Sequence, residues 1–217
     1  GCAYNVSESI RHFGVPYTLF SPIGTGIYGD FIRSEFEKRG RVCPLPTPDM
    51  DNGCCYCFVE ESGERTFISN HGAEYLIYDK WLCNVDVSAL EAIYICGLEI
   101  EEKTGDDIVR FLERARGVPV YFAPGPRLGI IPAARMRRIF ALSPIVHLNA
   151  DEICQYTGEN SLDAAARKLY SRTRNTVIIT NGSGGAYYFD GADLVHVAPF
   201  RIERVVDTIG AGDAHIG

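Results

Sequence analysis

The sequence predicts an α/β fold with a mostly parallel central sheet, helices on both of its faces and a small β-hairpin beside it. From Ala92 onward, short apolar runs rich in Val and Ile alternate with longer segments of helical periodicity. Such runs are typical of strands buried on both faces, where helices connect parallel strands. Earlier in the chain, alternating runs at 54–59 and 65–69 flank a turn-forming segment, which predicts the hairpin.

The bulk composition is that of one sizeable globular domain with 217 residues, of which 46% are hydrophobic and 23% are charged. No apolar run is long enough to span a bilayer and no secretory signal opens the chain, so we expect no membrane partner. The net charge of -7 argues against nucleic acid as a partner. A phosphorylated small molecule stays possible, because helix dipoles and metal ions can dominate a local site.

The 8 cysteines favour a reduced, cytoplasmic protein over a disulfide framework. Most of them lie singly among hydrophobic residues, as buried thiols do. Only Cys54, Cys55 and Cys57 cluster, and a zinc site there needs a second ligand pair with similar spacing, which the sequence lacks. We interpret the cluster as part of a β-strand.

The first 70 residues predict a helix, a strand, a second helix and the hairpin. The expected elements are a helix from Asn5 to Phe13, a strand from Tyr17 to Phe20, a helix over 27–39 and the two hairpin strands. Prolines between 44 and 48 break the chain before the hairpin. We therefore expect residues 43–70 to form a lid on a core made of residues 1–42 and 71–217.

The remaining elements alternate between strand and helix. We expect strands at Ala92–Cys96, Val118–Ala123, Ile145–Leu148 and Thr176–Thr180, helices at Asp106–Arg116, Pro132–Phe140, Asp151–Tyr156 and Leu162–Arg172, a hairpin of Tyr187–Phe189 and Leu194–Val197, and a strand-like run at Ile202–Val206. In sheets of this kind ligands bind at the carboxyl ends of the strands, so the loops that follow strands are the candidate sites.

The most informative of these loops is Asp207–Asp213, with the sequence D-T-I-G-A-G-D. Its glycines let a ligand approach the backbone, and the free N–H groups of the helix that follows attract anions such as phosphate. A carboxylate beside a phosphate site is unfavourable unless it acts as a base on the attacking group, which makes Asp213 a candidate general base. The alternative is an ordinary Gly-rich turn between a strand and a helix.

Three other loops carry candidate binding residues. Glu99 follows a strand and puts a carboxylate at the ligand edge of the sheet. Asn149 and Glu152 lie one helical turn apart and can hold a hydrated magnesium ion. The alternative is that Asn149 or Asp151 only caps the helix that follows, with Glu152 in solvent. The Gly-rich loop from Thr180 to Gly185 either contacts a nucleotide phosphate or merely connects a hairpin.

A further glycine-rich segment, Gly24–Gly29, matches the G-x-G-x-x-G spacing of dinucleotide-binding folds. Such a fold needs a strand that ends in an acidic residue about 20 positions later. Here that region contains three prolines, which exclude a central strand. A nicotinamide-dependent oxidoreductase is therefore a remote alternative, and no P-loop sequence is present.

Taken in order along the chain, these segments resemble the ribokinase-like (PfkB) carbohydrate kinase family. Asp207–Asp213 resembles its second signature, Gly1–Asn5 the end of its Gly-Gly-x-x-x-Asn substrate segment, Gly24–Asp30 its first Gly-rich signature, Asn149 with Glu152 its N-x-x-E motif, and Thr180–Gly185 its nucleotide loop. The resemblance implies a ribokinase-like three-layer sandwich with a mostly parallel sheet and a small β lid. It also implies ATP-dependent phosphorylation of a hydroxyl on a sugar or sugar-like substrate.

The resemblance further implies a role for each candidate residue. It assigns phosphoryl transfer to Asp213, Gly210, Ala211 and Gly212, sugar binding to Gly1, Asn5 and Glu99, ATP binding to Asn149, Glu152, Thr180, Gly182 and Gly185, magnesium to Asn149 and Glu152 through water, and a monovalent cation such as potassium to Asp207. Asp213 takes the proton of the acceptor hydroxyl, and the three amides before it form an anion hole. The hairpin closes over the sugar, and family members often dimerise through it.

Two features depart from the family pattern. His215 stands where an aromatic residue is usual after the catalytic aspartate. The family's opening strand and most of its adenine pocket have no counterpart, so we expect the chain to be truncated at both ends. The main alternative function is a catalytically silent, kinase-like sugar-binding or regulatory protein, which retention of Asp213, Asn149 and Glu152 argues against.

Overall fold

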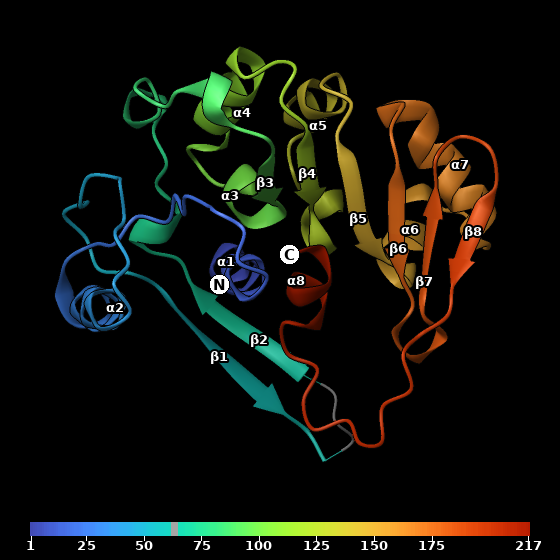
Figure 1. Ribbon diagram of the computed structural model, residues 1–217, viewed down its shortest axis with the longest axis horizontal. Coiled ribbons are helices and arrows are strands. Elements are labelled where there is room, and N and C mark those ends of the chain that lie inside the picture. The colour runs from blue at the N-terminus through green and yellow to red at the C-terminus, as the bar shows by residue number, and fades with distance from the viewer. Residues whose placement is uncertain (62–64) are drawn as a thin grey trace.

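The computed structural model describes residues 1–61 and 65–217 and has the expected α/β architecture (Figure 1). Its main sheet has six strands in the order β3-β4-β5-β6-β7-β8. The strands are β3 (Ile93–Cys96), β4 (Val120–Ala123), β5 (Ile145–Asn149), β6 (Val177–Thr180), β7 (Ala186–Phe189) and β8 (Leu194–Val197). Pairing is parallel from β3 to β6 and antiparallel for β7 and β8, which confirms the predicted mostly parallel sheet and late hairpin.

The helices that the sequence predicts are all present, with ends shifted by a few residues. The α-helices of the described chain are α1 (Cys2–His12), α2 (Gly26–Lys38), α3 (Gly97–Glu101), α4 (Gly105–Arg114), α5 (Ala133–Phe140), α6 (Ala150–Thr157), α7 (Leu162–Thr173) and α8 (Ala211–Ile216). Short 3-10 turns lie at 73–75, 79–81, 87–89, 125–129 and 182–184. The short helix α3 was expected to be a loop, so Glu99 lies on a helix instead.

The two faces of the sheet are covered by different helices, which gives three layers. Val146 and Leu148 of β5 are buried in the main hydrophobic cluster together with side chains of α4, α5 and α7. Because side chains alternate along a strand, His147 between them points to the opposite face. That face carries α1, which contacts β3, and α8 (Figure 1). Complete burial of a core side chain such as Phe122 contributes roughly 1.5–3 kcal/mol to this packing.

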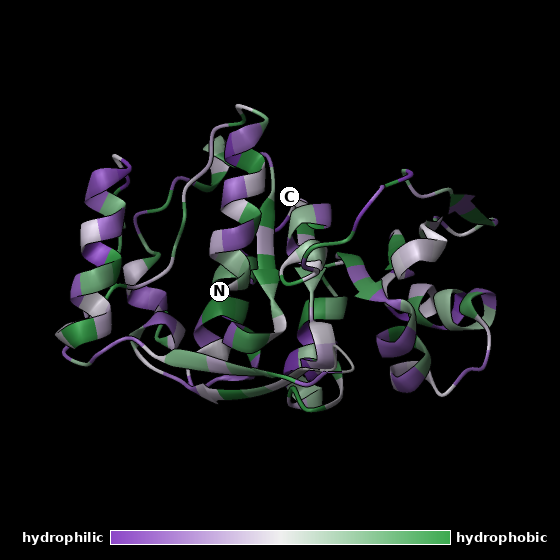
Figure 2. Ribbon diagram, turned by 90° about the horizontal axis from the view of Figure 1, so that it is seen from below, coloured by the Kyte–Doolittle hydropathy of each residue, from purple (hydrophilic) through white to green (hydrophobic). Residues whose placement is uncertain are grey.

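The predicted hairpin forms a separate two-stranded antiparallel sheet of β1 (Cys54–Val59) and β2 (Arg65–Asn70). The expected connection through 62–64 lies outside the described residues. In Figure 1 the hairpin extends away from the main sheet, and α1 and α8 lie between the two. Much of the hairpin is hydrophobic in Figure 2, and Tyr56, Phe58, Phe67 and Ile68 are each more than half exposed.

One carboxylate joins both stems of the hairpin. Glu74 Oε2 accepts hydrogen bonds from the Gly53 backbone N–H at 2.8 Å and from Asn52 Nδ2 at 3.0 Å, and Glu74 Oε1 accepts one from the Gly72 N–H at 3.1 Å. The stems approach so closely that a Cβ on Gly53 would lie 2.0 Å from the carbonyl oxygen of Asn70. Only glycine permits this crossing, which ties the hairpin to the core.

Two predicted strands are wrong. Residues 17–20 have no regular secondary structure, residues 202–206 contain a bend at Glu203, and neither segment pairs with a strand of the described chain. Phe20 packs against the main hydrophobic cluster, whereas Ile202 and Val206 are 66% and 84% exposed. A β-branched pattern favours an extended chain, but a strand also needs a neighbour to accept its hydrogen bonds.

The structure also bears on the cysteines and on membrane-spanning segments. All 8 cysteines are free, and the described residues contain no group of three or more His, Cys, Asp or Glu side chains arranged for a metal ion. Nothing there supports zinc at Cys54–Cys57. In the part of the chain that the structure describes, no helix combines the length and apolarity that crossing a membrane requires.

Candidate active site

Segments 208 positions apart meet at the candidate site, where Asn5 Nδ2 donates a hydrogen bond to Asp213 Oδ2 at 2.8 Å. The two residues lie on α1 and α8, which pack against each other. A second bond joins the same helices, because Ser9 Oγ donates to the carbonyl oxygen of Ala214 at 3.2 Å. The carboxylate of Asp213 is half-buried and keeps its other oxygen, Oδ1, outside this hydrogen bond.

The turn before Asp213 has the geometry that its glycines allow. Gly210 is the N-cap of α8 and has a φ of 76°, and a Cβ there would lie 3.3 Å from Asn5 Nδ2. Within the turn, Asp207 Oδ1 accepts the Ile209 N–H at 2.9 Å. The Ala211 N–H, one of the three expected anion-hole donors, points to the carbonyl oxygen of Thr208 at 3.2 Å. A Cβ on Gly212 would meet nothing within 4 Å, so the space before that residue is open.

Asn149 and Glu152 form a reciprocal capping box at the start of α6. Asn149 Oδ1 accepts the Glu152 N–H at 2.8 Å, and Glu152 Oε2 accepts the Asn149 N–H at 2.9 Å. Asn149 therefore caps the helix, as the alternative interpretation expected, but Glu152 takes part in the capping instead of lying in solvent. Burial raises the pKa of the Glu152 carboxyl, and its second oxygen, Oε1, faces Gly125. A cation near Oε1 would offset the cost of burying this carboxylate.

The glycine-rich loop after β6 lies beside this capping box. Thr180 is the last residue of β6 and pairs with Asn149 across the sheet. Gly182 and Gly185 have φ angles of 50° and 87°, and a Cβ on Gly185 would lie 2.3 Å from the Val197 carbonyl oxygen. The sheet thus brings the candidate nucleotide residues together at the carboxyl ends of β5 and β6.

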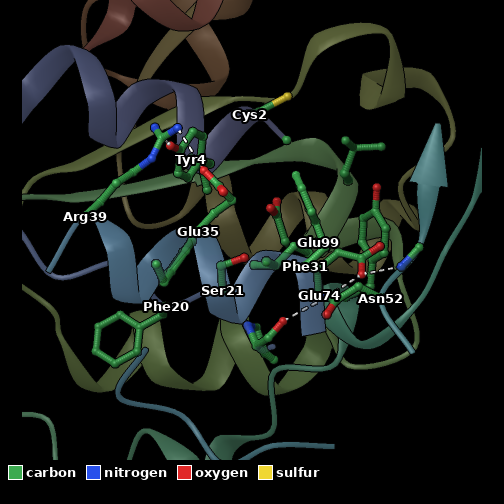
Figure 3. Close-up of a pocket in the computed structure, with 18 residues that line it drawn as sticks. Cys2, Tyr4, Phe20, Ser21, Phe31, Glu35, Arg39, Asn52, Glu74 and Glu99 are labelled. Carbon is green, nitrogen blue, oxygen red and sulfur yellow. Dashed lines mark hydrogen bonds and ion pairs between the residues drawn. The ribbon is translucent and has the colours of Figure 1, made fainter. Parts of the chain in front are cut away.

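A cavity of about 390 Å³ lies beside α1, and two of the three expected sugar-binding residues, Gly1 and Glu99, line it (Figure 3). Asn52 and Gly53 from the hairpin stem line it as well, so the hairpin stem and the core share the cavity. The third expected residue, Asn5, is not among the lining residues and instead contacts Asp213.

A thiol network that the sequence interpretation missed holds Glu99 in place. Cys96 Sγ donates to Glu99 Oε2 at 2.6 Å, and burial raises the pKa of the Glu99 carboxyl. Cys96 is buried, and a hydrogen bond with Cys2 of α1, followed by burial, raises the pKa of its thiol. Tyr94 lies on the same face of β3, and its buried hydroxyl has no hydrogen-bond partner among the described residues. The alternation of β3 was a signal for this face, but the contact with Cys2 was not visible in the sequence.

A histidine pair links the two halves of the site. His147 Nε2 and His215 Nδ1 are 3.0 Å apart, and the ring centroids are 5.1 Å apart. His147 is buried, and burial together with the nearby charge of His215 lowers its pKa to about 4. The link runs from β5, which carries Asn149, to α8, which carries Asp213.

The glycines at 24–29 serve packing. A Cβ on Gly24 would lie 1.9 Å from the Met50 carbonyl oxygen. Asp51 caps the start of α2, because its carboxylate accepts the Gly29 N–H at 2.8 Å and the Tyr28 N–H at 3.4 Å. Burial alone would raise the pKa of Asp51, but these backbone donors lower it. The protein's own carboxylate thus occupies the place where a dinucleotide phosphate would bind.

Comparisons with known proteins agree with this architecture. A family model for pfkB family carbohydrate kinases matches residues 1–217. The chain is 38% identical over 236 residues to the aminoimidazole riboside kinase of Salmonella typhimurium LT2, with 100% of this chain and 71% of that protein covered. It is 33% identical over 221 residues to YegV, an uncharacterized sugar kinase of Escherichia coli K12, with 100% and 68% covered. A fructokinase with bound ATP from Xylella fastidiosa has a TM-score of 0.80 at 20% identity, with 100% and 70% covered.

Proposed function

Because the chain belongs to the pfkB family of carbohydrate kinases, we propose that it transfers the γ-phosphoryl group of ATP to a hydroxyl of a sugar or sugar-like substrate, with Asp213 as the general base. The chain spans 68% of the length of its Escherichia coli relative and 71% of that of its Salmonella relative, and the proposal concerns the protein as a whole. The observation that supports it most is the hydrogen bond from Asn5 to Asp213, which joins the candidate sugar-binding amide to the candidate base.

The proposed reaction combines proton transfer to Asp213 with phosphoryl transfer from ATP. Asn5 holds Oδ2 of Asp213, so that Oδ1 accepts the proton of the substrate hydroxyl. The hydroxyl oxygen attacks the γ-phosphorus as the bond to the leaving ADP oxygen breaks, and the proton stays on Asp213. The N–H groups of Gly210 and Gly212 stabilise the charge on the phosphoryl oxygens, and that of Ala211 joins them when it leaves the carbonyl oxygen of Thr208. Gly1 and Glu99 bind other hydroxyls of the substrate, since both line the cavity beside α1.

The nucleotide half of the proposed site consists of the capping box and the loop after β6. Thr180, Gly182 and Gly185 contact the ATP phosphates, and Asn149 and Glu152 hold magnesium through water. The half-buried carboxylate of Glu152 suits this role, because a cation offsets the cost of its burial. A magnesium ion held there would neutralise part of the phosphate charge. Asp207 holds a monovalent cation such as potassium at the start of the turn.

The hairpin is the proposed lid. Closure of residues 43–70 over the cavity would exclude water and spare the phosphoryl group from hydrolysis. Asn52 and Gly53 line the cavity from the hairpin stem, which supports this role. The exposed apolar side chains of β1 and β2 support dimerisation through the lid. Eight free cysteines support a cytoplasmic location.

Replacement of Asp213 by Asn tests the proposal directly. We expect turnover to fall by about 10²–10⁴-fold, since the general base is lost, while sugar affinity changes little. The measurement is ADP release with ribose, fructose, deoxygluconate-type acids and nucleosides, together with calorimetric sugar binding. Asp193→Asn, in the exposed turn before β8, is the matched control. Near-normal turnover by D213N would falsify the assignment of the base.

The same assay separates the proposal from its rivals. A silent sugar-binding protein would bind a sugar without releasing ADP, so sugar-dependent ADP release by the unmodified protein excludes it. A nicotinamide oxidoreductase would bind NAD in calorimetry. We expect no NAD binding, because Asp51 occupies the start of α2.

A further inference from the structure

The contact between His147 and His215 has no part in the chemistry proposed above. The facing nitrogens, Nε2 of His147 and Nδ1 of His215, are 3.0 Å apart, which is hydrogen-bonding distance. A single proton between them lets one ring donate and the other accept. The contact is therefore a directional hydrogen bond between the two imidazole rings.

The two partners differ in how firmly they are held. His147 is only 6% exposed and lies on β5 between two core residues, so the sheet fixes its ring. His215 is exposed and lies on α8, a helix of 6 residues that follows an exposed segment without regular secondary structure. A helix this short has little stability of its own, so its orientation depends on tertiary contacts. His147 is thus fixed by the sheet, and its hydrogen bond to His215 helps to fix the orientation of α8.

The geometry of α8 directs its two polar side chains to different neighbours. Asp213 and His215 are two positions apart, which separates them by about 200° around a helix. Asp213 accordingly contacts Asn5 of α1, and His215 contacts His147 of β5. The helix that carries the proposed base is held from both sides.

Strand β5, which carries His147, also carries Asn149 of the proposed nucleotide-binding residues. His147 and Asn149 lie two positions apart on one strand, so they share a face of the sheet. We propose that the His147–His215 hydrogen bond is a positioning contact that fixes the distance between Asp213 and the nucleotide end of β5. This inference rests on the proposed function, since the distance matters for turnover only if Asp213 is the base.

Loss of the bond should affect turnover more than sugar binding. The Asn5–Asp213 bond and the cavity residues stay in place, but α8 can pivot on α1. A misplacement near 1 Å costs about 100-fold in rate for a group that must align with a reacting atom. We expect His215→Leu to lower kcat by about 10- to 100-fold and to change the KM for the sugar by less than about threefold.

Two further substitutions at the same exposed position separate bonding from packing. His215→Asn places an amide near the Nδ1 position and should restore much of kcat. His215→Phe keeps an aromatic ring without a nitrogen and should remain impaired. The matched control is His12→Leu, because His12 is an exposed histidine at the end of α1, away from β5. Wild-type kcat in H215L, or in H215F, would overturn the proposal.

A measurement that does not depend on catalysis tests the positioning role separately from the proposed function. Amide hydrogen exchange of residues 211–216 should be faster in H215L than in the unmodified protein, and H215N should restore the protection. Unchanged exchange in H215L would overturn the positioning role even in a protein that releases no ADP. If D213N is inactive while H215L is normal, only the positioning role fails. If D213N retains turnover, the base assignment fails.

Discussion

At the scale of single residues, the candidate site holds carboxylates in places that disfavour their charge. Burial raises the pKa of both Glu99 and Glu152, and each is oriented by a short-range donor rather than by a lysine or arginine. Such an arrangement is unfavourable for the isolated protein and becomes useful when a ligand supplies the missing partner. A sugar hydroxyl at Glu99 and a cation at Glu152 are suitable partners.

Glu99→Gln should therefore raise stability and weaken substrate binding. A raised pKa means that the folded state prefers the protonated carboxyl, so the ionised form destabilises the protein above that pKa. We expect a higher Tm for the variant than for the unmodified protein at pH 8, and a smaller difference as the pH falls toward 5. For a domain of this size, a gain of roughly 1 kcal/mol in the free energy of unfolding raises the Tm by about 2–4 °C. Calorimetry across this pH range measures it. A difference that does not depend on pH would contradict the explanation.

At the scale of elements, the glycine-rich segments that look alike in the sequence do different work. Gly24 lets the backbone meet Met50, and Gly53 lets the hairpin stems cross. Gly210 permits the left-handed turn into α8. Spacing alone does not distinguish these uses, because each depends on which backbone lies opposite the glycine.

Glu74→Ala tests the attachment of the hairpin. It removes the acceptor for the Gly53 and Gly72 N–H groups and for Asn52, and each buried donor left without a partner costs about 1–3 kcal/mol. We expect a severalfold higher KM for the sugar, faster amide exchange at Gly53 and Gly72, and more ATP hydrolysis without sugar. The exposed Glu91 provides the control substitution, Glu91→Ala. Unchanged exchange at both glycines would show that Glu74 does not hold the stems.

At the scale of the whole molecule, α1 and α8 come from opposite ends of the sequence and cover the same face of the sheet. They bring Asn5 to Asp213, and they leave His147 buried beneath α8. The face that carries the candidate site is thus linked to the buried imidazole of His147, whose ionisation affects the stability of the fold.

This coupling predicts sensitivity to acid. The pKa of His147 is lowered from 6.5 to about 4 in the folded protein, so the unfolded state binds more protons between these values. Stability is therefore lost as pH falls from 6.5 toward 4. We expect the unmodified protein to lose on the order of 1–2 kcal/mol more than His147→Gln between pH 7 and pH 5, measured by urea unfolding. Parallel losses in the two proteins would exclude His147 as the cause.

The elements of this fold were largely readable from local pattern. Helical periodicity predicted the long helices within a few residues, and apolar runs predicted the parallel strands from β3 to β6. The predictions failed at residues 17–20 and 202–206, where the pattern favoured a strand but no strand of the described chain pairs with the segment. The spacing of apolar residues indicates which face of a segment is apolar, but it does not indicate which other element packs against that face.

The sequence by itself determined the fold class and the candidate residues, because short-range backbone bonding and the spacing of apolar side chains act within a few positions. The tertiary structure alone decided which candidates meet. Asn5 contacts Asp213 across 208 positions and His147 contacts His215 across 68, while Asp51 rather than a phosphate caps α2. Contacts of this kind form only when packing closes long loops, so they depend on the whole fold and not on any one motif.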